Sequence, residues 1–255
     1  MNKEKIGMLV LGAVCVVATA VLALQAPIAQ DPAYHRFHDV RTLCAVPNFW
    51  NVLSNLPFML VGIMGCLWIL NPRSTGYLPQ LKWAYGIFFA GVAVVALGSG
   101  YYHLDPSNGA LVWDRLPMTV AFMALLAIIV GEFISPRAGR VLLLPLLIAG
   151  VASVLYWHVT EIRGAGDLRP YALVQFLPML LIPAILLLFK PAYTRTRGYW
   201  QLMGCYALAK ICEYFDAGMF NLLPVLSGHS LKHAVAAAGV YCLLKAYQTR
   251  VLITP

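Results

Sequence analysis

One stretch of the sequence decides the fold class: residues 82–103 read KWAYGIFFAGVAVVALGSGYYH. No Asp, Glu, Lys or Arg follows the lysine that opens it. As an α-helix of 22 residues it would rise about 33 Å, enough to cross a hydrocarbon core of ~30 Å. The stretch therefore predicts a transmembrane helix that ends in two polar side chains, Ser99 and His103.

The composition extends this prediction to the whole chain. Hydrophobic residues make up 61% and charged residues 11% of the 255 residues, and the mean hydropathy is +0.76, far from the soluble average. We expect an all-α polytopic membrane protein with no soluble domain. Eight apolar runs of about 20 residues predict helices near residues 6–26, 50–70, 82–103, 115–134, 141–160, 170–190, 199–219 and 229–249.

The first of these runs has two interpretations. A basic start, an apolar middle and the small residues before Gln30 also describe a cleaved signal peptide. Because the apolar run is longer than is usual for such peptides, we expect residues 1–30 to form an uncleaved signal-anchor helix. Residues 31–255 then form a second domain, a bundle of seven transmembrane helices.

The basic residues of the connections predict the topology, because cytoplasmic loops collect Lys and Arg. If the N-terminus is cytoplasmic, one set of loops holds eleven of them and the opposite set holds five. This bias places both termini in the cytoplasm and explains the net charge of +8 without nucleic acid as a partner. The first set is Lys3, Lys5, Arg73, Lys82, Arg137, Arg140, Lys190, Arg195, Arg197, Lys245 and Arg250, and the second is Arg36, Arg41, Arg115, Arg163 and Arg169.

A second polar stretch, GHSLKH at residues 228–233, begins the last apolar run. His229 and His233 are spaced i,i+4, as are Ser99 and His103, so each pair shares one helical face. The predicted topology brings both pairs and Asp114 to the outer side of the membrane. Three imidazoles, a hydroxyl and a carboxylate suit a catalytic zinc ion, which takes three protein ligands and keeps one position open for water.

Each signal also has a structural interpretation. Serine and histidine at a helix end are often only interfacial, and Asp114 followed by Arg115 could be a surface ion pair. However, Asp114 is expected to open a helix, where the helix dipole favours an ionised carboxylate. An ionised carboxylate beside a metal site is what a general base requires.

Other polar residues are expected to have structural roles. Asn51, Ser54 and Asn55 share one face of an apolar helix and are expected to hydrogen bond between helices. Lys210 and Glu213 lie inside an apolar run at i,i+3 spacing. We expect them to form an ion pair, because unpaired charges within a membrane are costly.

Glu132 is expected either to snorkel to the inner face or to pair with Arg137. We further expect interfacial positions for His35 and His38. The spacing of the six cysteines predicts neither a disulfide framework nor a thiolate site.

Together the motifs resemble the alkaline ceramidases, within a superfamily that also holds the adiponectin/progestin-type receptors and the Per1-type proteins. The resemblance covers residues 31–249 and keeps the spacing between its motifs. It implies a seven-helix bundle with zinc held by His103, His229 and His233, and with Ser99 and Asp114 assisting catalysis. The matching motifs are NFWNVLSN at 48–55, Ser99-x-x-x-His103, Asp114 and His229-x-x-x-His233.

Two departures from the family pattern bear on the expectations. An extra helix precedes the seven, and the acidic calcium-binding segment of the animal enzymes is not recognisable. Asp31, Asp39 and Asn48 could still supply oxygen ligands, so calcium is the weaker expectation and zinc the main one. Both departures look more like a bacterial member, in a cytoplasmic membrane.

The function expected is zinc-dependent hydrolysis of the amide bond of ceramide or a related N-acyl lipid drawn from the bilayer. A receptor of the same superfamily could use the zinc structurally, although such receptors have long cytoplasmic segments. A proton or ion transporter could use Asp114, Lys210, Glu213 and Asp216 as a relay, but these residues gather toward one face.

Overall fold

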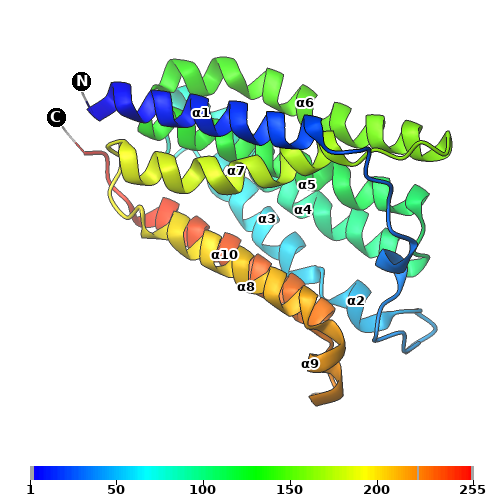
Figure 1. Cartoon of the computed structure of the whole chain (residues 1–255). Helices are drawn as coiled ribbons and strands as arrows, with labels where there is room; N and C mark the ends of the chain where they lie inside the picture. The colour runs from blue at the N-terminus through cyan, green and yellow to red at the C-terminus, as the bar shows by residue number, and fades with distance from the viewer. Residues whose placement is uncertain (1–2, 223, 254–255) are drawn as a thin grey trace.

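A computed structural model describes residues 3–222 and 224–253 as an all-helical chain (Figure 1). Two short 3-10 helices, η1 (Pro32–His35) and η2 (Pro79–Leu81), accompany the α-helices. Within the described residues the α-helices are α1 (Lys3–Leu24), α2 (Phe49–Leu53), α3 (Leu56–Leu70), α4 (Lys82–Leu104), α5 (Asn108–Phe133), α6 (Pro136–Ile162), α7 (Arg169–Leu188), α8 (Arg197–Tyr214), α9 (Asp216–Leu222) and α10 (Gly228–Thr249).

Six segments in the described part of the chain are long and apolar enough to cross a membrane: α1, α2 with α3, η2 with α4, α5, α6 and α7. A helix is also present at the two remaining predicted runs, as α8 and α10. Charged side chains, among them Lys210 and Glu213 on α8 and Lys232 on α10, make these two helices less apolar. Because the other six segments are long and apolar enough to cross a membrane, the chain is a helical membrane protein.

The helix α5 lies at the centre of the bundle. It packs against α4, α6 and α7, while α10 packs against α3 and α8, and α1 lies outside against α7 (Figure 1). Gly98 lets α4 approach α5 closely, because a Cβ atom at this position would lie 2.0 Å from the carbonyl oxygen of Trp113. This approach brings the C-terminal end of α4 against the first turns of α5.

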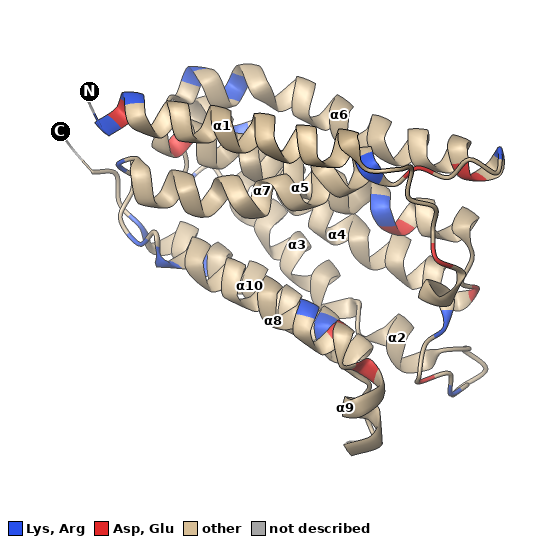
Figure 2. Ribbon diagram, in the orientation of Figure 1, with Lys and Arg blue, Asp and Glu red and all other residues tan. Residues whose placement is uncertain are grey.

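The chain termini and the start of α10 lie at opposite ends of the bundle (Figure 1). Residues 25–48 cross the end at which α4 finishes and α10 begins, and both termini lie at the other end. Charged residues gather toward the two ends of the long helices, with ribbon free of Lys, Arg, Asp and Glu between them (Figure 2).

Three predicted helical runs differ from the structure, and the first of them, 50–70, breaks at Ser54 and Asn55 between α2 and α3. The helix α5 begins at Asn108, not near 115, because the Ser107 hydroxyl caps it by accepting a hydrogen bond from the Ala110 N–H at 3.2 Å. Asp114 is therefore nearly two turns inside α5 and gains little from the helix dipole, which acts mainly in the first turn. The run predicted at 199–219 breaks at Phe215, between α8 and α9.

The expected pairing of Glu132 with Arg137 is also wrong. Glu132 instead forms a salt bridge with Arg250, which follows the last helix, and it accepts hydrogen bonds from the hydroxyls of Tyr85 and Tyr199. Both charged side chains are 2% exposed. This buried cluster ties the C-terminal end of the chain to α4, α5 and α8.

Candidate active site

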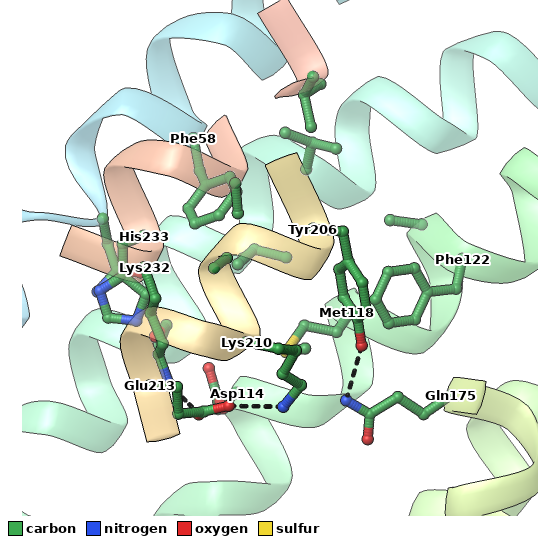
Figure 3. A pocket seen from close by; sticks show the side chains of 18 of the residues that line it. Phe58, Asp114, Met118, Phe122, Gln175, Tyr206, Lys210, Glu213, Lys232 and His233 are labelled. Carbon is green, nitrogen blue, oxygen red and sulfur yellow. Dashed lines mark hydrogen bonds and ion pairs between the residues drawn. The ribbon is translucent and has the colours of Figure 1, made fainter. Parts of the chain in front are cut away.

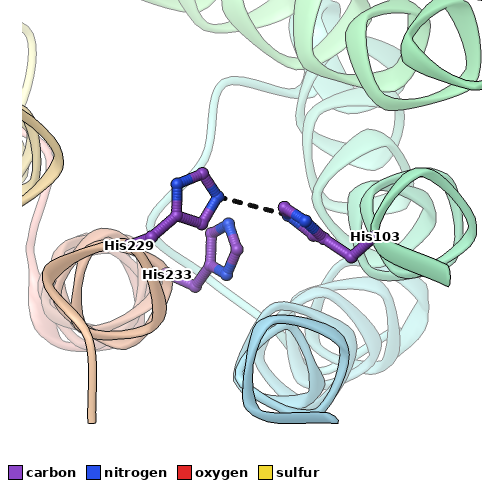
Figure 4. Close-up of side chains that lie close together, drawn as sticks. All are labelled: His103, His229 and His233. Carbon is purple, nitrogen blue, oxygen red and sulfur yellow. Dashed lines mark hydrogen bonds between the residues drawn. The ribbon is translucent and has the colours of Figure 1, made fainter. Parts of the chain in front are cut away.

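Three histidines from two distant helices meet inside the bundle (Figure 4). His103 lies in the last turn of α4, and His229 and His233 lie in the first two turns of α10. All three are buried, and their candidate ligand atoms lie within 4.8 Å of one another. Elsewhere in the described residues, no other three His, Cys, Asp or Glu side chains form such a group. The triad could therefore bind a metal ion.

One pair in the triad has the spacing expected between two ligands of a zinc ion. A tetrahedral ion with Zn–N bonds of 2.0–2.1 Å separates its ligand atoms by about 3.3–3.4 Å, and the Nε2 atoms of His103 and His229 lie 3.3 Å apart. The ring of His233 is also oriented. Its Nδ1 lies 2.8 Å from the Ser54 hydroxyl, which in turn donates to the Asn51 carbonyl oxygen. The Ser54 oxygen can then accept a hydrogen bond from the Nδ1–H of His233. In this tautomer the lone pair of His233 Nε2 is free to bind an ion.

The amides of the NFWNVLSN motif hold the helices around the triad. Asn51 Oδ1 accepts a hydrogen bond of 2.9 Å from the Ser230 hydroxyl, and Asn48 Nδ2 donates to the His103 carbonyl oxygen at 2.8 Å. The expected interhelical hydrogen bonding is thereby confirmed. Asn55 differs, because its Nδ2 bonds to the Asn51 carbonyl oxygen whereas its Oδ1 is buried without a partner.

The segment 31–48 covers the triad. The centroid of the Phe37 ring lies 4.7 Å from the centroid of the His103 ring and 4.6 Å from that of the His229 ring. Neighbouring histidines fasten the segment: His35 bonds to the Tyr102 hydroxyl and His38 to the Asp216 carboxylate, each at 2.9 Å. Neither His35 nor His38 belongs to the described group of three histidines that could hold a metal, and their expected interfacial positions stay a prediction.

All five predicted site residues line one cavity: the three histidines of the triad, Ser99 and Asp114. Ser99 stands one turn before His103 on α4, and Asp114 of α5 lines the same cavity. Asn55 also lines this cavity. An acceptor without a partner, a hydroxyl, a carboxylate and three imidazoles thus face one enclosed space.

The cavity is polar at one end and apolar at the other. On α10 its lining runs from His229, Lys232 and His233 to Ala236 and Val240. The helices α4, α5 and α8 repeat this order, with polar residues toward the triad. Their polar lining residues are Ser99, His103, Asp114, Lys210 and Glu213, and their apolar ones include Phe88, Val92, Val95, Met118, Phe122, Leu125, Leu202 and Met203. Such a space suits an amphiphile with a long apolar chain.

The Lys210–Glu213 pair is present, with 2.6 Å between the ammonium nitrogen and a carboxylate oxygen. Sequence reasoning missed its third member, Lys232, whose Nζ lies 2.5 Å from the other oxygen of Glu213 (Figure 3). The position of Lys232 between the two histidines of an apolar helix could have indicated this contact, because a charged side chain there needs a partner of opposite charge.

The acidic residues considered for calcium are engaged within the protein. Asp31 Oδ1 accepts a hydrogen bond of 2.8 Å from the Ala33 N–H, and Asp39 forms a salt bridge with Arg41 at 2.6 Å. Asp216, which the sequence offers only as part of a transporter's relay, accepts from the His229 N–H at 2.7 Å in addition to bonding His38. It therefore helps to place the first histidine of α10.

The sequence matches one family model, described as Ceramidase, over residues 39–253. The matched region begins within the segment that covers the triad and includes α2 to α10, and with them all five predicted site residues. A search among curated proteins found no match.

Proposed function

The chain belongs to the ceramidase family, and from this relationship we propose that it is a zinc-dependent hydrolase of the membrane. Its reaction cleaves the amide bond of ceramide, or of a related N-acyl lipid, to a fatty acid and a free amine. The observation that carries the proposal is the buried histidine triad at the polar end of a largely apolar cavity.

His103, His229 and His233 would hold the zinc ion. Their spacing and the orientation of His233 by Ser54 support this assignment. A zinc ion bound by neutral imidazoles polarises a carbonyl group and lowers the pKa of a water ligand to about 7.

Asp114 is proposed as the general base and acid. It accepts a proton from water as the water oxygen adds to the amide carbonyl, and it returns a proton to the nitrogen as the C–N bond breaks. The Ser99 hydroxyl, which lines the same cavity, would donate a hydrogen bond to the oxyanion. The unpartnered Oδ1 of Asn55 offers an acceptor for the amide N–H of the substrate.

We also propose how the protein lies in the membrane. All eight predicted segments cross it, as a signal-anchor helix (residues 1–30) followed by a seven-helix domain (residues 31–255). The pairing of Lys210 with Glu213 reduces the cost of charge on α8. The loop charges favour both termini in the cytoplasm, and the proposed location is a bacterial cytoplasmic membrane. With the termini at the end opposite the start of α10 (Figure 1), the active site faces outward.

The test is metal analysis and fatty-acid release by the purified protein. We expect about one zinc per chain and release of fatty acid from ceramide or a related N-acyl lipid. Asp114→Asn should retain zinc and lower kcat about 10²–10⁴-fold, whereas Asp105→Asn, an exposed position just after α4, should change neither. A zinc-free protein, or full activity in Asp114→Asn, contradicts the proposal. Zinc without hydrolysis of any N-acyl lipid would favour a receptor with a structural metal.

A further inference from the structure

A cluster of three charges lies at the polar end of the cavity. Glu213 of α8 gives one carboxylate oxygen to Lys210 and the other to Lys232 of α10 (Figure 3). All three line the same space as the triad and Asp114. The side chains of Glu213 and Lys232 are 21% and 17% exposed, whereas that of Lys210 is 41% exposed, so Glu213 and Lys232 form the more buried part of the cluster.

The two ammonium groups retain unused hydrogen-bond capacity. Each lysine has three N–H donors, and among the described residues Glu213 is the only acceptor bonded to either of them. A pair that served only to neutralise charge on α8 would need one lysine, whereas this cluster has two. Four donors thus remain beside the reacting groups.

The cluster also carries excess positive charge. Two ammonium groups and one carboxylate give a formal +1, which Asp114, the other carboxylate of the cavity, would offset. The net positive charge of the cluster itself lies on its two ammonium groups, which in surroundings of low dielectric favour an anionic ligand.

We propose that Lys210 and Lys232, held together by Glu213, recognise an anionic oxygen group on the amine half of the substrate. This inference rests on the proposed function and narrows its substrate class to N-acyl lipids whose amine carries a carboxylate or a similar anion. N-acyl amino acids have this chemistry, whereas ceramide itself is neutral.

The direction of the cavity assigns the anion to the amine half. The acyl chain needs the apolar end, and the amide carbonyl must lie between the triad and Asp114. The amine half then remains at the polar end, where Lys210 of α8 and Lys232 of α10 meet Glu213.

The experiment compares two amides with the same acyl chain and nearly equal head groups, N-palmitoylglycine and N-palmitoylethanolamine. At neutral pH the first carries a carboxylate and the second a neutral hydroxyl. We expect the full-length, zinc-loaded protein to favour the glycine amide in kcat/KM by roughly tenfold to a hundredfold, as expected for a charge-assisted hydrogen bond.

The lysine variants test whether this preference comes from the cluster. Lys210→Met and Lys232→Met should each lower the ratio of the two kcat/KM values toward one, and Lys210→Arg should keep it. The control is Lys245→Met on α10, because Lys245 bonds to Gln248 at an exposed position away from the cavity. An unchanged ratio in both Met variants, or equal rates for both amides in the unaltered protein, overturns the inference.

A binding measurement separates this inference from the proposed function. Affinities of both amides for the chelator-treated protein should show the same preference and the same loss in the Met variants, even if neither amide is hydrolysed. Equal affinities overturn the inference whatever the activity. If the Met variants relieve only inhibition by palmitate, the lysines bind the carboxylate of the acyl product, which also overturns it.

Discussion

Two buried polar clusters lie at opposite ends of the bundle. They differ in how many of their polar atoms have a hydrogen-bond partner. Around Glu132 each carboxylate oxygen accepts from Arg250 and from one tyrosine hydroxyl, and Arg250 Nε donates to the Gly76 carbonyl oxygen at 2.8 Å. In the histidine triad and its surroundings, His103 Nδ1 and Asn55 Oδ1 are buried without a partner.

The difference distinguishes a structural cluster from a candidate site. Buried polar groups that satisfy one another hold the fold together, whereas buried groups with spare capacity beside a cavity are available to a ligand. Substitutions in the two clusters should therefore act on different measurements, which the following predictions test from the largest expected effect to the smallest.

The largest effect is expected for His103→Ala. Loss of one of three ligands should reduce bound zinc to well below one per chain and lower amide hydrolysis by at least about 10³-fold. The melting temperature should stay close to that of the unaltered protein after treatment with a chelator. A variant that keeps its zinc, or one that unfolds like a Glu132 variant, would remove the distinction between the clusters.

Glu132→Gln should act on stability instead. It leaves the Arg250 guanidinium, 2% exposed, without its anionic partner, and breaking a buried pair typically costs about 3–5 kcal/mol. Unfolding in detergent measures this loss, while the zinc content of the folded fraction should be unchanged. The double variant Glu132→Leu, Arg250→Met is the control, because removing both charges should cost less than removing one.

Ser54→Ala should produce a smaller effect, confined to the metal. Ser54 orients the ring of His233 through Nδ1 at 2.8 Å, and loss of such a partner lowers metal affinity about 10–100-fold. Competition with a zinc chelator measures the affinity, and activity should recover at high zinc concentration. Ser74→Ala, in the loop after α3, should leave the affinity unchanged. Equal affinities in both variants would mean that Ser54 does not support the triad.

The smallest effect concerns an ion pair at the edge of the bundle. Hydrogen bonds from Arg169 lower the pKa of Asp167 to about 2, below the ordinary value of about 3.9. The stabilisation is therefore present above about pH 4 and lost as the pH falls through about 2. Asp167→Asn should cost about 1 kcal/mol at neutral pH. Melting curves of both proteins should converge toward pH 2, and a constant difference would contradict this linkage.

Much of the fold follows from local sequence. The long apolar runs form helices because a helix satisfies its own backbone within hydrocarbon, and the i,i+4 spacing puts His229 and His233 on one face. The Lys210–Glu213 pair follows from the same periodicity. These features depend on residues close together in the chain, so the sequence alone predicted them.

Only the tertiary structure decided which distant residues meet. Glu132 pairs with Arg250 and not with the nearby Arg137, Lys232 reaches Glu213, and Ser54 supports His233. Each contact joins different helices or the chain end, and no local period encodes which helices become neighbours. The physical reason is packing: close approaches such as that at Gly98 set the order of the helices, and that order decides where each buried polar group finds its partner.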